Sequence, residues 1–214
     1  VFQALGQNES VLELGQMVLD ILDEADIEEF DIIRLAVIDN MVNACFSMKE
    51  WKKFEDMSDY RYDLIKKIEA YGFAGMEGMD AEYRRLNDKM RLATVSGDLE
   101  AMYEYNEQIL AILEVLFEKD PEMHVSSYIS SLEVKYQNEI NKNPSKFLSI
   151  AGNYEKFVRD EILPRLGDVA RSEVMYNVEY LYVWYYQKHS MFAESYPHVI
   201  KMNEYADVLE EMAL

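Results

Sequence analysis

The fold is decided by residues 80–119, which read DAEYRRLNDKMRLATVSGDLEAMYEYNEQILAILEVLFEK. On both sides of a central Ser-Gly-Asp triplet, apolar residues recur three and four positions apart: Tyr83, Leu86, Met90, Ala93, then Leu99, Met102, Ile109, Leu113 and Leu116. That spacing predicts two amphipathic helices. A connection as short as residues 96–98 forces neighbouring helices to run antiparallel. The stretch therefore predicts a helical hairpin.

The same pattern extends along the chain on both sides of this hairpin. We expect an all-α protein with about nine helices in antiparallel pairs, and repeat-like pairs near residues 30–71, 80–119, 122–166 and 168–213. Four prolines and eight glycines are few for an all-β protein, which needs frequent turns. We expect residues 1–214 to form one helical-repeat domain. Because the sequence starts with Val1, we also expect it to be a fragment of a longer protein.

Several helix boundaries can be predicted from short patterns. Asp120-Pro121 is typical of a helix start, because Asp caps well and Pro suits the first helical position. Ser47 with Glu50 matches a capping box and predicts the start of another helix. Three glycines lie within residues 72–78. A phosphate-binding loop would need a preceding strand, so we interpret this stretch as a helix connection.

The charge of the chain narrows the classes of partner. A formal net charge of −20, without any block of Lys and Arg, argues against nucleic acid and against anionic membranes. No apolar run is long enough to span a bilayer, so we expect a cytoplasmic protein. Residues 1–33 hold nine carboxylates and neither Lys nor Arg. That segment is either a solvated helix face with a loop or a surface for a basic partner.

Motifs for catalysis are missing from the sequence. The single cysteine, Cys45, excludes an internal disulfide and sits in an apolar helical stretch, which favours a buried thiol. His124, His189 and His198 form no metal-binding pattern, although Glu194 lies four residues before His198. No nucleophile elbow, Walker motif or dinucleotide fingerprint occurs. We therefore expect no enzyme, no cofactor and no metal.

One acidic cluster supports an alternative. Asp20, Asp23 and Glu24 lie on one predicted helix, and such clusters hold magnesium against diphosphate in all-helical prenyl-chain enzymes. A matching cluster on a facing helix should accompany it, and Glu104 with Glu107 qualifies by spacing alone. The alternative function is therefore a metal-dependent all-helical enzyme that uses the first cluster.

Residues 96–103, Ser-Gly-Asp-Leu-Glu-Ala-Met-Tyr, resemble the turn between the two helices of a repeat in the tetratricopeptide-repeat-like (TPR-like) superfamily. Residues 41–62 and 182–202 are similar, and the resemblance covers about half of the chain. It implies a right-handed TPR-like α-solenoid in which the first helix of each pair lines a concave groove. The implied function is a protein- or peptide-binding scaffold, such as a regulatory or sensor domain. Its partner would be a protein or peptide, with a basic one favoured by the acidic surface, or an adjoining domain.

The resemblance also implies which residues line the groove. Carried over position by position, they are Asn43, Arg84, Asn87, Arg91, Asn177, Tyr180 and Trp184. The spacing of Arg84, Asn87 and Arg91 puts them on one helix face, where they could hold a peptide carboxylate. The alternative is a surface face whose arginines pair with Glu82 or Asp88.

An unusual run of aromatic and aliphatic residues occupies positions 180–186, Tyr-Leu-Tyr-Val-Trp-Tyr-Tyr. It covers every face of a helix, so that helix is either a central one buried between neighbours or a groove wall that faces a partner.

Overall fold

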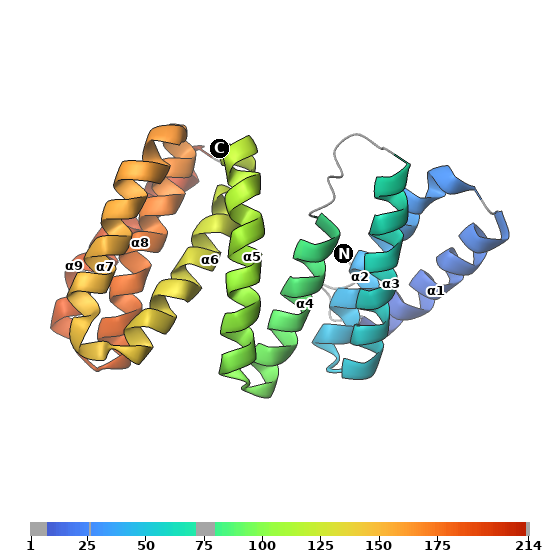
Figure 1. Cartoon of the computed structure of the whole chain (residues 1–214), viewed down its shortest axis with the longest axis horizontal. Coiled ribbons are helices and arrows are strands. Elements are labelled where there is room, and N and C mark those ends of the chain that lie inside the picture. Colours follow the sequence, from blue (N-terminus) through green and yellow to red (C-terminus); the bar gives the residue numbers. More distant parts are fainter. Residues whose placement is uncertain (1–7, 26, 72–79, 213–214) are drawn as a thin grey trace. The chain divides into compact units, whose positions relative to one another are not determined.

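The structure, a computed structural model, describes residues 8–25, 27–71 and 80–212. Every regular element within these ranges is helical, which confirms the all-α prediction. The described α-helices, labelled in Figure 1, are α1 (Asn8–Ala25), α2 (Asp31–Ser47), α3 (Trp51–Ala70), α4 (Asp80–Ser96), α5 (Leu99–Lys119), α6 (Pro121–Lys142), α7 (Phe147–Phe157), α8 (Asp168–Lys188) and α9 (Phe192–Met212). The glycine-containing connection predicted at residues 72–78 lies outside the described residues.

Contacts divide the chain into two compact units, Val1–Met102 and Tyr103–Leu214, here called the N-terminal unit and the C-terminal unit. In the N-terminal unit, α1 packs on α2, α2 on α3, and α3 on α4. In the C-terminal unit, α8 packs on both α9 and α6, and α7 contacts α6 and α8. The expectation of one domain over residues 1–214 stays a prediction.

Two predicted turns are confirmed by their geometry. The chain leaves α4 at Ser96 and enters α5 at Leu99, and Gly97 takes a φ of 76°, where a side chain would be strained. The Asp98 carboxylate accepts a hydrogen bond from the Ala101 amide at 3.1 Å. Asp120 caps α6 in the same way, accepting from the Met123 amide at 3.1 Å.

The capping box predicted at Ser47 and Glu50 is wrong. Ser47 is the last residue of α2, and its hydroxyl donates to the Asn43 carbonyl at 2.8 Å. Glu50 precedes α3 without a side-chain capping bond. The helix ends instead through Lys49, whose left-handed φ of 60° lets the Glu50 amide reach back to the Cys45 carbonyl at 3.0 Å.

Short irregular helices interrupt the regular ones. Single 3₁₀ turns precede α2 (η1, Glu28–Phe30) and α7 (η2, Pro144–Lys146). After α7 the chain widens into a π-turn (η3, Val158–Ile162) and closes in a 3₁₀ turn (η4, Leu163–Arg165). Pro164 explains this, because its ring would clash with the carbonyl four residues earlier in a regular helix.

The buried face of α1 differs from the predicted one. The apolar pattern of this stretch predicts an inward face made of Val11, Leu14, Val18, Ile21, Leu22 and Ala25. Leu22 is buried as predicted, whereas 37% of the surface of Val18 and 65% of that of Ile21 are exposed. Gly15 and Leu19, which lie outside the predicted face, are buried as well. The reason is that α1 carries apolar residues on two adjacent faces, and the face with the glycine allows α2 to approach most closely.

Each unit has its own core. In the N-terminal unit the cluster comprises Leu19, Leu35, Ile38, Met41, Val42, Cys45, Phe54, Leu64, Ile65, Ile68 and Ala81. In the C-terminal unit the side chains with almost no exposure include Ile109, Leu113, Ile129, Ile140, Ala151, Tyr154, Val158, Val174, Val178 and Leu181. Among the described helices, none combines the length and the apolar character that a membrane span requires.

Candidate functional site

In the N-terminal unit, α2 and α4 are joined by side chains although α3 separates them in sequence. Arg84 on α4 donates to both carboxylate oxygens of Asp39 on α2, at 3.0 and 2.8 Å. Two turns further along α4, Arg91 donates to the side-chain oxygen of Asn43 on α2 at 3.2 Å. The structure therefore brings together three of the residues predicted to line a groove. We call this surface, with Asn87, the α2–α4 face.

The arginines of the α2–α4 face already have carboxylate partners. Arg61 on α3 lies beneath the face and contacts Asp39 at 2.9 Å and Asp88 at 2.5 Å. Asp88 also accepts from the Ser58 hydroxyl at 2.5 Å and lies 3.5 Å from Arg91. The pairing of Arg91 with Asp88 is one that the sequence left open. A peptide carboxylate at this face would have to compete with these aspartates.

Arg91 is held further by an aromatic ring. Its guanidinium carbon lies 3.9 Å from the centroid of the Phe46 ring, well inside cation–π range. Burial lowers the pKa of Arg91, while the nearby Asp88 carboxylate opposes that change. The Asn87 amide donates to the Tyr83 carbonyl of its own helix at 3.0 Å. These contacts hold the α2–α4 face in one arrangement.

In the C-terminal unit, α6 and α8 lie side by side in a similar way. Lys188 near the end of α8 donates to the Asn141 side-chain oxygen on α6 at 2.7 Å. Toward the other end of both helices, the Ser126 hydroxyl donates to the Glu173 carboxylate. We call the surface of α8 between these two bridges the α6–α8 face. It carries three more predicted residues, Asn177, Tyr180 and Trp184.

The aromatic run of α8 is divided between the core and this face. Leu181 is fully buried, and Tyr182 and Val183 nearly so. Tyr180 keeps 39% of its surface exposed, and Trp184 is half-buried with the Lys188 ammonium 5.0 Å from its ring centroid. The Asn177 amide donates to the Glu173 carbonyl at 3.0 Å. One side of α8 is therefore packed as a central helix, and the other presents Tyr180 and Trp184.

Sequence reasoning missed a buried carboxylate on the packed side of α8. Glu179 has an exposed fraction of 2%, and its two oxygens meet His198 Nδ1 at 2.5 Å and Lys201 Nζ at 3.0 Å, both from α9. The His198 ring also stacks on Tyr182 with centroids 4.4 Å apart. The only signal in the sequence was an acidic residue between apolar neighbours. The spacing in the sequence pairs His198 with Glu194 of its own helix instead.

The acidic cluster at Asp20, Asp23 and Glu24 does not assemble into a metal site. The Asp20 carboxylate accepts from the Gln16 amide at 2.8 Å, and Asp23 pairs with Arg34 at 3.2 Å. Within the residues that the structure describes, no group of three or more His, Cys, Asp or Glu side chains converges as metal binding requires.

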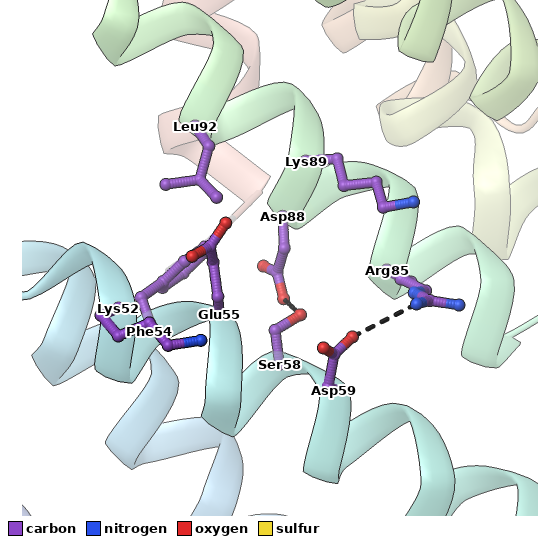
Figure 2. Close-up of a pocket in the computed structure, with 9 residues that line it drawn as sticks. All are labelled: Lys52, Phe54, Glu55, Ser58, Asp59, Arg85, Asp88, Lys89 and Leu92. Carbon is purple, nitrogen blue, oxygen red and sulfur yellow. Dashed lines mark hydrogen bonds and ion pairs between the residues drawn. The ribbon is translucent and has the colours of Figure 1, made fainter.

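A hollow of about 260 Å³ lies between α3 and α4 (Figure 2). Its lining comprises Lys52, Phe54, Glu55, Ser58, Asp59, Arg85, Asp88, Lys89 and Leu92. Its charges are mixed, and two of them, Arg85 and Asp59, pair with each other at 3.3 Å. Such a lining does not select a ligand of one charge. We therefore place the candidate site on the helix faces and not in this hollow.

No protein-family model, no curated protein and no solved structure matches the chain. The resemblance to the TPR-like superfamily therefore stays a prediction.

Proposed function

We propose that the chain is a non-enzymatic scaffold that binds a protein or peptide on the α6–α8 face. The observation that carries the proposal is the partial exposure of Tyr180 and Trp184 on a helix whose other side is buried. Tyr and Trp supply a large apolar surface with one polar group, and they are enriched among residues that dominate binding energy. A rigid helix presents them without a large loss of conformational entropy.

In this proposal α2 and α4, like α6 and α8, are the inner helices of a right-handed TPR-like solenoid. The bridges from Asp39 to Arg84 and from Asn141 to Lys188 support it, because each joins helices that alternate in sequence. Such a scaffold fits a regulatory or sensor domain of a larger protein. The alternative, a metal-dependent enzyme, has less support, because Asp23 of its acidic cluster already forms an ion pair with Arg34.

The experiment is a selection of displayed random peptides on the immobilised full chain. Enriched peptides are then titrated against the wild type and against a Tyr180→Ala, Trp184→Ala double variant. We expect the double variant to bind at least about tenfold more weakly. The matched control is Phe192→Ala with Tyr196→Ala, two aromatic residues of α9 that are more exposed, at 67% and 65%. This control should change the affinity by less than about twofold.

Two results would contradict the proposal. In one, no peptide is enriched, or the enriched peptides bind the double variant as well as the wild type. In the other, thermal melting by circular dichroism shows that the double variant loses its fold. Tyr180 and Trp184 would then be core residues, and the assignment of the α6–α8 face would be wrong.

A further inference from the structure

The first described helix presents an apolar surface to solvent. On α1, Leu14, Met17, Val18 and Ile21 have exposed fractions of 45%, 60%, 37% and 65%. Their spacing of three, four and seven residues puts them on one side of the helix. We call these four residues the α1 strip. Large apolar side chains gathered on one exposed face are typical of an interaction site.

Packing inside the N-terminal unit does not account for the α1 strip. The helix already buries Gly15, Leu19 and Leu22 against the unit, and α1 packs on α2. A second apolar face on α1 therefore indicates that something else covers it.

The charge beside the strip indicates the chemistry of that partner. Glu13, Asp20 and Glu24 are exposed, and their spacing of seven and four residues lines them up along one edge of the strip. Residues 1–33 contain nine carboxylates and neither Lys nor Arg. The next residue, Arg34, is buried and pairs with Asp23 and Asp31. The exposed surface of α1 is therefore apolar and anionic.

We propose that the α1 strip binds an amphipathic helix of a partner protein with Lys or Arg beside its apolar face. The apolar side chains of that helix would cover the strip, and its cations would meet the acidic edge. This names a partner chemistry for the proposed scaffold, on a surface separate from the α6–α8 face. A second copy fits less well, because an antiparallel pair of α1 helices sets one acidic edge against the other in a chain of net charge −20.

The test uses two synthetic peptides of about five helical turns, made only of Leu and Lys. In one, Leu recurs at helical spacing, and in the other the same residues are scrambled. Both carry the same charge, so any preference reports the apolar match. We expect the amphipathic peptide to bind the full chain at least about tenfold more tightly than the scrambled one. Affinity should fall as salt is added.

Variants of the chain locate the binding. Met17→Ser with Ile21→Ser should weaken the amphipathic peptide at least about tenfold, whereas Val95→Ser with Leu99→Ser should change it by less than about twofold. The control residues are also exposed, at 50% and 57%, in the same unit.

A second pair of variants tests the acidic edge. Glu13→Gln with Glu24→Gln should weaken binding more than Glu100→Gln with Glu107→Gln. Both pairs remove the same charge from exposed positions, so only location differs between them.

Three outcomes would overturn this inference: equal binding of the two peptides, equal effects of strip and control variants, or a wild-type dimer that the strip variant dissociates in sedimentation. The Tyr180→Ala, Trp184→Ala variant keeps the two proposals apart. It should bind the Leu/Lys peptide like the wild type. If only this variant lost binding of the Leu/Lys peptide, the peptide would bind the α6–α8 face. The assignment to α1 would then be wrong, and the scaffold proposal would still hold.

Discussion

Glu133 on α6 should make the C-terminal unit less stable as the pH rises. Burial raises the pKa of the Glu133 carboxyl from 4.5 to about 7. Its carboxylate accepts a hydrogen bond at 2.6 Å from the side-chain amide of Gln137, which carries no charge. An ionised carboxylate that is buried without a cation is unfavourable, so the folded protein holds this proton more tightly than the unfolded chain does.

The sign and size of the effect follow from that pKa. Because the folded pKa lies above the unfolded one, the stabilisation is complete below pH 4.5 and is lost as the pH rises through about 7. The difference between the two values corresponds to about 3 kcal/mol of unfolding free energy. Glu133→Gln mimics the protonated carboxyl at every pH. We therefore expect the variant to match the wild type near pH 4.5 and to exceed it by about 3 kcal/mol near pH 8.

The assay is urea denaturation at a series of pH values. Trp51→Phe in both proteins leaves Trp184 as the sole indole, and it lies in the same unit as Glu133. Taking the difference between variant and wild type removes the titration of all other groups. Glu139→Gln, an exposed position on the same helix, is the control and should give a difference independent of pH. A difference for Glu133→Gln that is constant from pH 4.5 to 8, or that shrinks with pH, would refute this reasoning.

The remaining predictions concern packing and buried charge. Asp88→Ala should cost about 3–5 kcal/mol, because it leaves the buried Arg61 with one carboxylate fewer, and thermal melting should show it. Asp59, the exposed partner of Arg85, is the control: Asp59→Ala should lower the free energy of unfolding by less than about 1 kcal/mol. Leu113→Ala should cost about 2–5 kcal/mol in urea denaturation, because the side chain is 1% exposed; a smaller loss would contradict its place in the core.

Local signals in the sequence predicted the helices and several of their ends. The triplet at residues 96–98 and the Asp120-Pro121 pair succeeded because each encodes its own geometry, a left-handed glycine in one and a capping carboxylate in the other. The capping box predicted at Ser47 and Glu50 is wrong because Ser47 belongs to the last turn of α2. The left-handed residue that ends this helix is Lys49, and a capping box describes only how a helix starts.

Periodicity identified α1 as a helix and could not say which apolar face turns inward. Val18 and Leu19 are neighbours of similar apolar character, and only the second is buried. What separates them is Gly15, because a Cβ there would lie 2.6 Å from the Met41 sulfur on α2. That contact depends on the partner helix, so it becomes visible only when both helices are placed.

The partners of the candidate site residues were equally hidden. Arg84 pairs with a carboxylate 45 residues away, and the buried Arg61 reaches Asp39 and Asp88 over 22 and 27 residues. Spacing within one helix put Arg84 and Arg91 on the same side, which helical geometry fixes. It could not show that Asp39 of α2 already pairs with Arg84, or that Asn43 of α2 already accepts a hydrogen bond from Arg91.

Those long-range ion pairs also explain why the excess negative charge of the chain lies on its surface. The chain has 41 carboxylates and 21 Lys and Arg residues. Two of the arginines, Arg34 and Arg61, are nearly buried, and each binds carboxylates from two different stretches of helix. Because these two arginines are buried between helices, they neutralise little of the negative charge at the surface. Many carboxylates therefore remain exposed to water, as on α1. The arrangement that holds the helices together therefore leaves a strongly negative surface, and this charge supports the basic partner that we propose for the α1 strip.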